Sequence, residues 1–304
     1  MRAAEEAAVT AGDLLTLDEL HDLRGLSGLR GAALVLHAWA IIGTAMALYT
    51  AYPSAITLLA AIAVVGSRQL GLAVLMHEAA HWRLFAHLRL NSRVAQWLCA
   101  YPVWAELTRY RRQHHLHHRH TQQAEDPDLA LAAAYPVTRA AFYWEVVRDL
   151  SGMTAWACVR SGMEWPSGVS ATWRRLRGPI AANVALLGVL AGIGHWSLYL
   201  LLWVLPLVTW YPFVSRLRNI AEHAVVSDAD DPLRNTRTVD AGLVERAFLA
   251  PYWMNYHLEH HLLVFVPCWK LTRARSLLLA KGYGPRMEAA PSYASVIRRA
   301  TSGH

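Results

Sequence analysis

Most of the sixteen histidines in this chain stand in four short groups. The first group, His77-Glu-Ala-Ala-His81, places two imidazoles four residues apart, on one face of a helix. Two later groups share the pattern HxxHH, whose three side chains lie within about 100° of one another around a helix. These groups are His114, His117 and His118, and His257, His260 and His261. A ninth histidine, His223, follows Asn219 by four residues.

Imidazoles clustered in this way predict a metal centre, because neutral ring nitrogens are ligands that suit iron, zinc and copper. Nine candidate ligands are too many for one ion and suit two. The expected ligands are His77, His81, His114, His117, His118, His223, His257, His260 and His261. Groups nearby could orient these rings by accepting the other imidazole N–H, and the candidates are Glu78, Asp126, Glu222 and Asn255. Asp126 and Glu222 could equally be surface acids.

The elements that must position these groups are predicted to be membrane helices. The chain is 55% hydrophobic and 17% charged, whereas soluble domains are about a quarter charged. A bilayer-spanning helix takes about 20 residues. Four segments are apolar enough to cross, at about 32–50, 55–76, 179–195 and 197–214. Only a few residues separate the first two and the last two, so we expect an all-α integral membrane protein with four spans in two hairpins.

The cationic residues predict the side of the membrane on which the histidines lie. Of 29 Lys and Arg residues, three precede the first span, 13 lie between the second and third, and 12 follow the fourth. Neither hairpin loop contains any. By the positive-inside rule both termini and the histidines are cytoplasmic. The same distribution explains the net charge of +7 without nucleic acid binding.

Arg68 is the one cation inside a span. It lies about two and a half helical turns before His77, and a buried cation in a span usually faces the bundle interior or a wet cavity. Arg68 is therefore a candidate for the substrate tunnel, and a structural or snorkelling arginine is the alternative.

The spans and histidines divide the chain into three parts. A cytosolic segment is expected at 1–30 and a membrane domain at 31–285. Residues 286–304 are expected to form a flexible C-terminal tail.

The order HxxxH, HxxHH, HxxHH on two membrane hairpins resembles the integral membrane fatty acid desaturase and hydroxylase superfamily, over about residues 68–271. Thr121, Asp126-Pro127 and Val266-Pro267 also match it. The resemblance implies four spans, a cytosolic helical cap that holds two irons, and a tunnel for an acyl chain. It also implies that His223 completes the ligand set and that Asn219 holds a water on one metal.

Two features depart from the pattern of the superfamily. Three residues separate His77 from His81, where the mammalian acyl-CoA type has four. After the third group the sequence reads Leu-Leu-Val-Phe-Val-Pro at 262–267, in place of a Phe/Tyr-Pro run. The substrate of the acyl-CoA type is therefore not transferred to this chain.

The resemblance implies O₂-dependent desaturation of a fatty acyl chain or related lipid, with hydroxylation and alkene-forming oxidative decarboxylation as alternatives. Removing hydrogen from an unactivated methylene needs a strong oxidant, which two irons and O₂ can supply together. No haem, flavin or iron–sulfur motif occurs in the sequence, so a separate electron donor is expected, a ferredoxin or a b-type cytochrome with its reductase. The basic cytosolic surface suits an acidic donor and anionic membrane lipids alike. A bacterial inner membrane is the expected location.

Two other classes of protein remain open. His77-Glu78-Ala-Ala-His81 is also the HExxH motif of zinc proteases, in which the glutamate is the general base. That reading needs one further ligand and leaves both HxxHH groups unexplained. A membrane protein that stores metal or binds lipid without turnover is the other class, and it would consume no O₂.

The charge distribution makes a topology prediction. Labels attached at Pro53 and Trp196 should react from outside the cell, and labels near His118 and at the C-terminus should react only from the cytoplasmic side. Impermeant cysteine labelling of intact cells and of inside-out vesicles measures both. Protection of the C-terminus in inside-out vesicles would overturn this topology.

Overall fold

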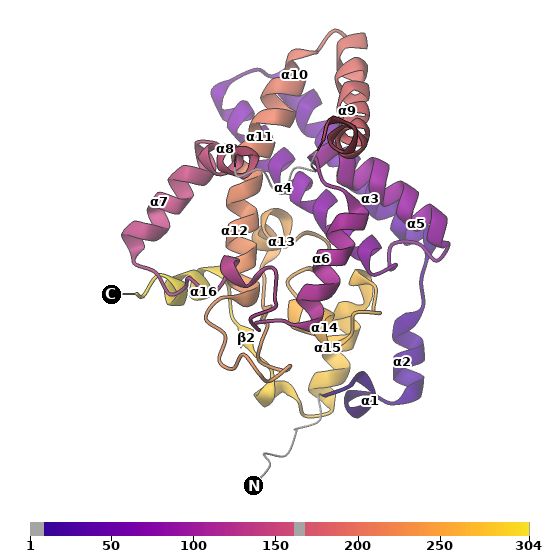
Figure 1. Ribbon diagram of the computed structural model, residues 1–304, viewed down its shortest axis with the longest axis vertical. Helices are drawn as coiled ribbons and strands as arrows, with labels where there is room; N and C mark the ends of the chain where they lie inside the picture. Colours follow the sequence, from indigo (N-terminus) through magenta and orange to yellow (C-terminus); the bar gives the residue numbers. More distant parts are fainter. Residues whose placement is uncertain (1–8, 161–167, 304) are drawn as a thin grey trace.

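The structure, a computed structural model, describes residues 9–160 and 168–303. Over these residues it is helical apart from two paired strands of two residues each (Figure 1). The first eight residues of the expected N-terminal segment and His304 in the expected tail lie outside the described residues.

Helices α3 (Gly28–Ala51) and α4 (Ala55–Ala80) form the first hairpin. The turn between them is short because the hydroxyl of Ser54 caps α4, accepting the backbone N–H of Thr57 at 3.1 Å. Both helices cover the spans expected at 32–50 and 55–76. Helix α4 continues four residues beyond its expected end and so carries His77 in its last turn.

The second hairpin pairs α9 (Val169–Gly192) with a helical run over Ser197–His223. This run comprises α10 (Ser197–Tyr199), a π-helical turn η4 (Leu200–Val204), α11 (Leu205–Val208) and α12 (Trp210–His223). It extends nine residues past the end expected for the fourth span, at 214, and ends on His223. Two of the four helical segments that were expected to span therefore end in a histidine group.

Three helices of the described chain are long and apolar enough to cross a membrane: α3, α4 and the run Ser197–His223. Helix α9, which contains the expected span 179–195, is not among them. Its first part carries Arg174, Arg175 and Arg177, and the apolar part that follows is shorter than the ~20 residues of a full crossing. Large side chains such as Leu36 of α3 and Leu59 of α4 are more than half exposed, as expected of surfaces that face lipid.

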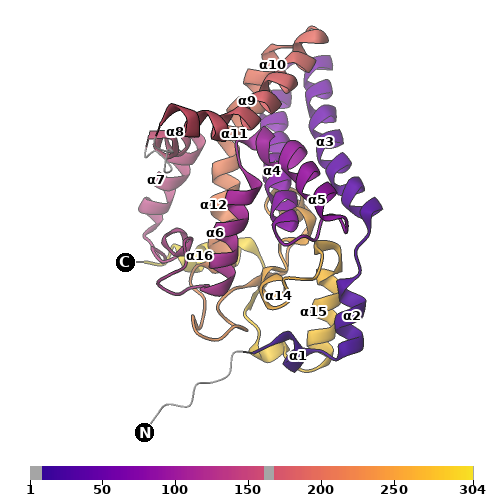
Figure 2. The ribbon, with the colours of Figure 1, turned by 45° about the vertical axis from the view of Figure 1, so that its right-hand side comes forward.

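The remaining elements build a body at one end of these helices (Figure 2). Between α4 and α9 they are α5 (Leu88–Val94), η1 (Ala95–Ala100), η2 (Tyr101–Val103), α6 (Leu107–Arg119), η3 (Leu129–Leu131), α7 (Arg139–Leu150) and α8 (Met153–Arg160). After α12 they are β1 (Thr238–Val239), α13 (Leu243–Phe248), η5 (Pro251–Trp253), α14 (His257–Leu262), η6 (Cys268–Lys270), α15 (Leu271–Ala280), η7 (Gly284–Arg286), β2 (Ala289–Ala290) and α16 (Tyr293–Ala300).

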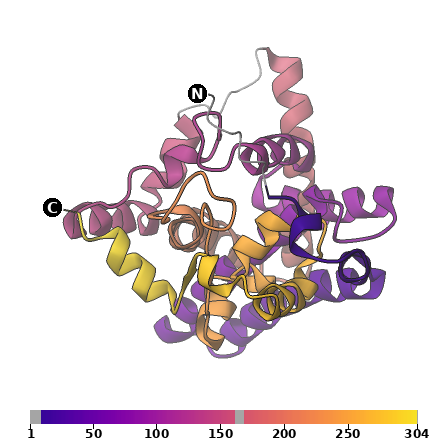
Figure 3. The ribbon, with the colours of Figure 1, turned by 90° about the horizontal axis from the view of Figure 1, so that it is seen from below.

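The N-terminal segment packs against this body, at the end opposite the two hairpin turns. Helices α1 (Ala11–Leu14) and α2 (Leu17–Arg24) lie beside α15 (Figures 2 and 3). Lys281 pairs with Glu19 at 3.0 Å, and the hydroxyl of Tyr283 donates to the carbonyl of Asp13 at 2.9 Å. The N-terminal segment, the histidine groups and the C-terminal helices therefore share one end of the molecule.

The C-terminal segment is packed, so the expectation of a flexible tail at 286–304 was wrong. Strand β2 pairs in parallel with β1. Helix α16 buries Tyr293, Val296 and Ala300, which recur at helical spacing along one face. A short amphipathic helix at a chain end can fold against a body that the sequence pattern does not reveal.

The start of α3 is pressed against the loop that follows His81, and this contact makes a stability prediction. A Cβ on Gly31 would meet the carbonyl oxygen of Leu84 at 2.1 Å, whereas one on Gly43 of the same helix would meet nothing within 4 Å. We expect Gly31→Ala to destabilise the protein by about 1–3 kcal/mol through overpacking. Gly43→Ala should leave stability unchanged or raise it. Thermal unfolding in detergent compares the two, and equal melting temperatures would contradict the close approach.

Candidate metal centre

The end of α4 holds the first histidine group. His77 lies in the last turn, and His81 is the residue that ends the helix. The last carbonyls of a helix lack partners within it. Here Arg111 of α6 donates to the carbonyls of Ala79 at 2.9 Å and Ala80 at 3.0 Å. This arginine fixes the end of α4 to the helix that carries the second group.

Helix α6 carries the second group on the side that faces α4. It begins at Glu106, whose carboxylate accepts the backbone N–H groups of the first turn. His114 and His117 are buried, and His118 is half-buried. The Tyr110 ring stacks on that of His114, with their centres 5.1 Å apart.

Helix α14 carries the third group and is only about one and a half turns long. Its His257 and His260 are buried. Its position depends on Glu259, which points away from the other histidine groups and is fully buried. The Glu259 carboxylate accepts from the hydroxyl of Thr238 in β1 and pairs with Arg275 of α15 at 2.9 Å.

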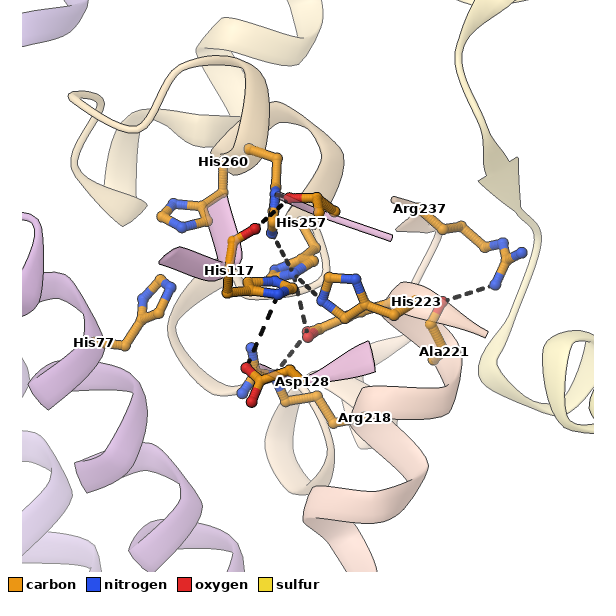
Figure 4. A network of polar contacts seen from close by, with 12 residues as sticks. His77, His117, Asp128, Arg218, Ala221, His223, Arg237, His257 and His260 are labelled. Atoms are coloured by element: carbon orange, nitrogen blue, oxygen red, sulfur yellow. Dashed lines mark hydrogen bonds and ion pairs between the residues drawn. The ribbon is translucent and has the colours of Figure 1, made fainter. Parts of the chain in front are cut away.

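His223 is the last residue of α12. Arg237 binds this helix end, donating to the carbonyls of Ala221 at 3.0 Å and Ala224 at 2.9 Å. Figure 4 shows Arg237 reaching the backbone of Ala221 behind His223. Arg237 is fully buried and is paired with Glu288 at 3.0 Å.

These four helix ends bring all nine histidines together in two sets. In each set, one ligand nitrogen of every ring lies within 4.8 Å of those of the others. The first set is His77, His81, His114, His118 and His260. The second set is His117, His223, His257 and His261. Figure 4 shows His117, His223 and His257 close together, with His77 and His260 to one side of them.

Within each set the ring nitrogens face one another. In the first set the Nε2 of His118 lies 2.9 Å from that of His114 and 3.1 Å from that of His260. In the second set the Nε2 of His257 lies 2.9 Å from that of His223 and 3.0 Å from that of His261. The two sets adjoin, because the rings of His118 and His261 stack with their centres 4.1 Å apart.

Both HxxHH groups are divided between the sets. The second group gives His114 and His118 to the first set and His117 to the second. The third group gives His260 to the first set and His257 and His261 to the second. In each case the two residues four apart go to one set and the residue between them goes to the other.

The sets are largely buried, and burial lowers the pKa of six of their imidazoles. Burial, reinforced by neighbouring histidines and arginines, lowers the pKa of His81 to about 3. The same causes hold the pKa values of His114, His118, His257, His260 and His261 well below the usual range. Buried ring nitrogens of six histidines have no hydrogen-bond partner: His77, His81, His118, His223, His257 and His260. In His118, His223, His257 and His260 the unpartnered nitrogen is Nδ1, whereas the Nε2 atoms converge on one another. Ring nitrogens that converge on other ring nitrogens are a donor set that suits a transition metal.

Two expected orienting groups contact histidines of the second set. The Asp126 carboxylate lies 2.8 Å from Nδ1 of His117. Burial would raise the pKa of Asp126, but the contact with His117 and the backbone N–H groups of Gln122 and Asp128 together lower the pKa. The Glu222 carboxylate lies 3.5 Å from Nε2 of His257 and pairs with Arg218 at 2.7 Å.

The other two expected orienting groups support the backbone of the third group. Glu78 accepts the backbone N–H of Cys268 at 2.8 Å and lies 3.6 Å from Nδ1 of His77. Asn255 donates to the carbonyl of Val239 in β1 at 3.0 Å and has no histidine partner. Asn255 therefore ties the start of α14 to β1, because its amide points toward the strand and away from the rings.

Asn219 lies one turn before His223 on α12. Its Oδ1 is buried without a hydrogen-bond partner. It lines a cavity of about 430 Å³ beside the second set, which has four histidines where the first has five.

Comparison with known proteins identifies the family. The family model for fatty acid desaturases matches residues 51–289. The chain belongs to the fatty acid desaturase family. It is 27% identical to a dihydrorhizobitoxine desaturase from Bradyrhizobium elkanii, over 71% of this chain and 66% of that protein. It is also 27% identical to a beta-carotene ketolase from Paracoccus sp. (strain PC1), over 80% of this chain and 90% of that protein. Membership of this family and the names of these relatives support an oxidoreductase, and the two histidine sets could hold metal.

The cavity beside the histidines of this desaturase-family protein has an apolar wall on α4. Its lining includes Leu70, Ala73 and Met76, which recur every three residues along α4. Tyr110, which stacks on His114, and Asn219 also line it. At 100° per residue these α4 side chains point to the same half of the helix as His77.

Arg68 lines a different cavity, which contains none of the nine histidines. It is separated from His77 by 180° around α4. None of the nine histidines lines either cavity, and only the cavity of about 430 Å³ approaches them, through Tyr110. The role of Arg68 in a substrate tunnel stays a prediction.

Several residues that position the site escaped sequence reasoning. Tyr110 could have been found, because it precedes His114 by one turn on the same face. Arg111, Arg237 and Glu259 act on backbone groups or on distant elements. No spacing in the sequence signals such contacts.

The neutral histidines predict how stability depends on pH when no metal is bound. Unfolded histidines take up protons below about pH 6.5, but these buried rings resist protonation until the pH is much lower. The unfolded state then binds more protons, so the stability of the metal-free protein should fall as pH drops from about 6.5 toward 4. Chemical unfolding in detergent measures this, and His260→Leu should give a shallower decline. A profile that is flat between pH 7 and pH 5 would contradict burial of neutral imidazoles.

Proposed function

We propose that this protein is an O₂-dependent di-iron enzyme that introduces a C=C double bond into a fatty acyl chain or a related lipid. The observation that carries the proposal is the convergence of nine histidines into two sets, next to a cavity whose lining includes Tyr110, which stacks on His114. Family membership and a relative named as a desaturase support it.

The proposed ligands of one iron are the five histidines of the first set. The four of the second set hold the other, with a water carried by Asn219 in the remaining position. The fit rests on the ring nitrogens that converge within each set and on the unpartnered Oδ1 of Asn219. When bound, the two irons supply O₂ activation and the oxidising power to remove hydrogen from an unactivated methylene.

The residues of the chain orient the rings and the substrate. Asp126 accepts the Nδ1 proton of His117, which leaves the Nε2 lone pair facing inward. The hydroxyl of Thr121 lies 3.3 Å from Nδ1 of His261 and serves that ring in the same way. Leu70, Ala73 and Met76 give an acyl chain an apolar wall that excludes water.

The proposal includes the membrane topology and the partners. We infer four spans, with α9 crossing as the partner of the run Ser197–His223 and local bilayer thinning accommodating its short apolar part. The body with the histidines then lies on the cytoplasmic side of a bacterial inner membrane, as a helical cap. There it can meet a ferredoxin or a b-type cytochrome as electron donor.

Oxygen insertion is the second candidate reaction. The relative from Paracoccus is named as a ketolase, and hydroxylation shares the first hydrogen abstraction with desaturation. The HExxH alternative has less support, because both HxxHH groups lie in the histidine sets and it leaves them unexplained. One oxygen of Glu78 also accepts the Cys268 backbone N–H at 2.8 Å.

The test is lipid mass spectrometry of cells that do or do not express the protein, under oxygen. Desaturation lowers a lipid mass by two, hydroxylation adds one oxygen, and decarboxylation gives a shortened alkene. We expect the lipid lowered in mass by two from the parent and no product from His223→Ala, although His223 lies outside the HxxxH group and both HxxHH groups. Proteolysis in the parent with no O₂-dependent product would sink the proposal.

The matched control is His120→Ala, which removes an imidazole next to the second group but outside both sets. It should keep most activity. Metal analysis after anaerobic purification should give about two irons per chain in the parent and in this control, and about one in His223→Ala. A full metal complement in an inactive His223→Ala variant would remove His223 from the ligands.

A further inference from the structure

A cavity of about 730 Å³ lies away from the histidines. Residues of α3, α4, α13 and η5 line it, and most of them are apolar. Arg68 and Arg246 are its two arginines, and Tyr252 and Trp253 lie at its η5 side.

This cavity and the one beside the histidines lie on opposite faces of α4. If Val64 is placed at 0° around the helix axis and each residue adds 100°, Arg68 and Gly71 lie within about 40° of Val64. Ala73 of the other cavity falls at about 180° and His77 at about 220°. Helix α4 itself therefore separates this cavity from the reaction site.

Arg68 faces the cavity as a buried cation without a counter-charge. It is 6% exposed. It donates to the carbonyl of Ala247, and its guanidinium lies 5.7 Å from the centre of the Tyr252 ring. Among the described residues no carboxylate lies within ion-pair distance of it, whereas the other buried arginine, Arg237, is paired with Glu288. An unpaired cation inside a membrane span is costly, and such a residue usually marks a binding site.

The lining places the cavity in the leaflet on the histidine side. His37 lies about one third of the way along α3 from its histidine end. Its Nδ1 is hydrogen-bonded to the Tyr252 hydroxyl at 3.2 Å. Helix α13 covers the cavity and exposes Leu243 by 85% and Val244 by 73%. A short helix that exposes apolar residues and carries a cation, here Arg246, suits the interface between headgroups and acyl chains.

We propose that this cavity binds an anionic lipid of that leaflet, with the acidic headgroup on Arg68 and Arg246 and the acyl chain along the apolar lining. A guanidinium binds a carboxylate or a phosphate through two parallel hydrogen bonds. The headgroup supplies the charge that Arg68 lacks, and the chain fills the apolar part. This site is independent of the proposed oxidation, because it involves no histidine of either set.

Native mass spectrometry of the purified full chain in mild detergent tests the proposal, without any measurement of turnover. The probes are phosphatidylglycerol, oleate, phosphatidylcholine and inorganic phosphate. We expect the parent to retain one molecule of phosphatidylglycerol or oleate, and the tighter of the two identifies the acid as phosphate or carboxylate. Equal retention of phosphatidylcholine would overturn the proposal. Inorganic phosphate that displaces the lipid at similar concentration would overturn the lipid assignment.

The variant Arg68→Gln should weaken binding of the anionic lipid about tenfold or more, as expected for loss of one charge-assisted interaction. Arg89→Gln, on the exposed surface of α5, is the matched control and should bind as the parent does. If Arg68→Gln does not fold, Ala33→Trp fills the cavity from α3 and leaves Arg68 in place. Unchanged affinity in the folded Arg68 variant or in Ala33→Trp would overturn the site.

Discussion

Nine imidazoles pack against one another at the junction of the apolar helices and the body, and six of them have a buried ring nitrogen without a hydrogen-bond partner. Burial of unsatisfied polar atoms is costly, and the surrounding structure opposes that cost by fixing each helix end. The two apolar helices that carry histidines are fixed in the same way. Arg111 binds the last carbonyls of α4, and Arg237 binds those of α12. A cation at a helix C-terminus is favourable for the helix dipole as well, so the arginines stabilise both the helices and the site.

The third group depends on longer-range contacts. Helix α14 is too short to be stable alone, and Glu259, Asn255 and the Glu78–Cys268 contact hold it against β1, α15 and α4. The C-terminal strand β2 pairs with β1 and so supports the same place. A segment that looks like a dispensable tail in sequence therefore contributes to the position of the histidines.

The sequence was a good guide to the helices that the histidines occupy and to three of the four spans, because apolar length and i, i+4 spacing are local properties. It failed where a long-range contact decides. The short apolar part of α9 and the packing of α16 depend on their neighbours. The spacing of an HxxHH group places three rings on one side of a helix but does not assign them to sets, since that requires the other helices. Glu78 illustrates the same limit, because HExxH places a carboxylate beside His77 but does not predict that one of its oxygens binds the backbone of Cys268.

The division of each HxxHH group between two sets has a mechanical consequence. His117 and His118 are covalent neighbours but serve different sets, as do His260 and His261. The separation of the two sets is therefore governed by the geometry of one helical turn in α6 and of one in α14, rather than by the packing distance between helices. If α6 or α14 shifts, the histidines that it gives to the two sets move together. The spacing between those histidines therefore stays the same when the helix moves.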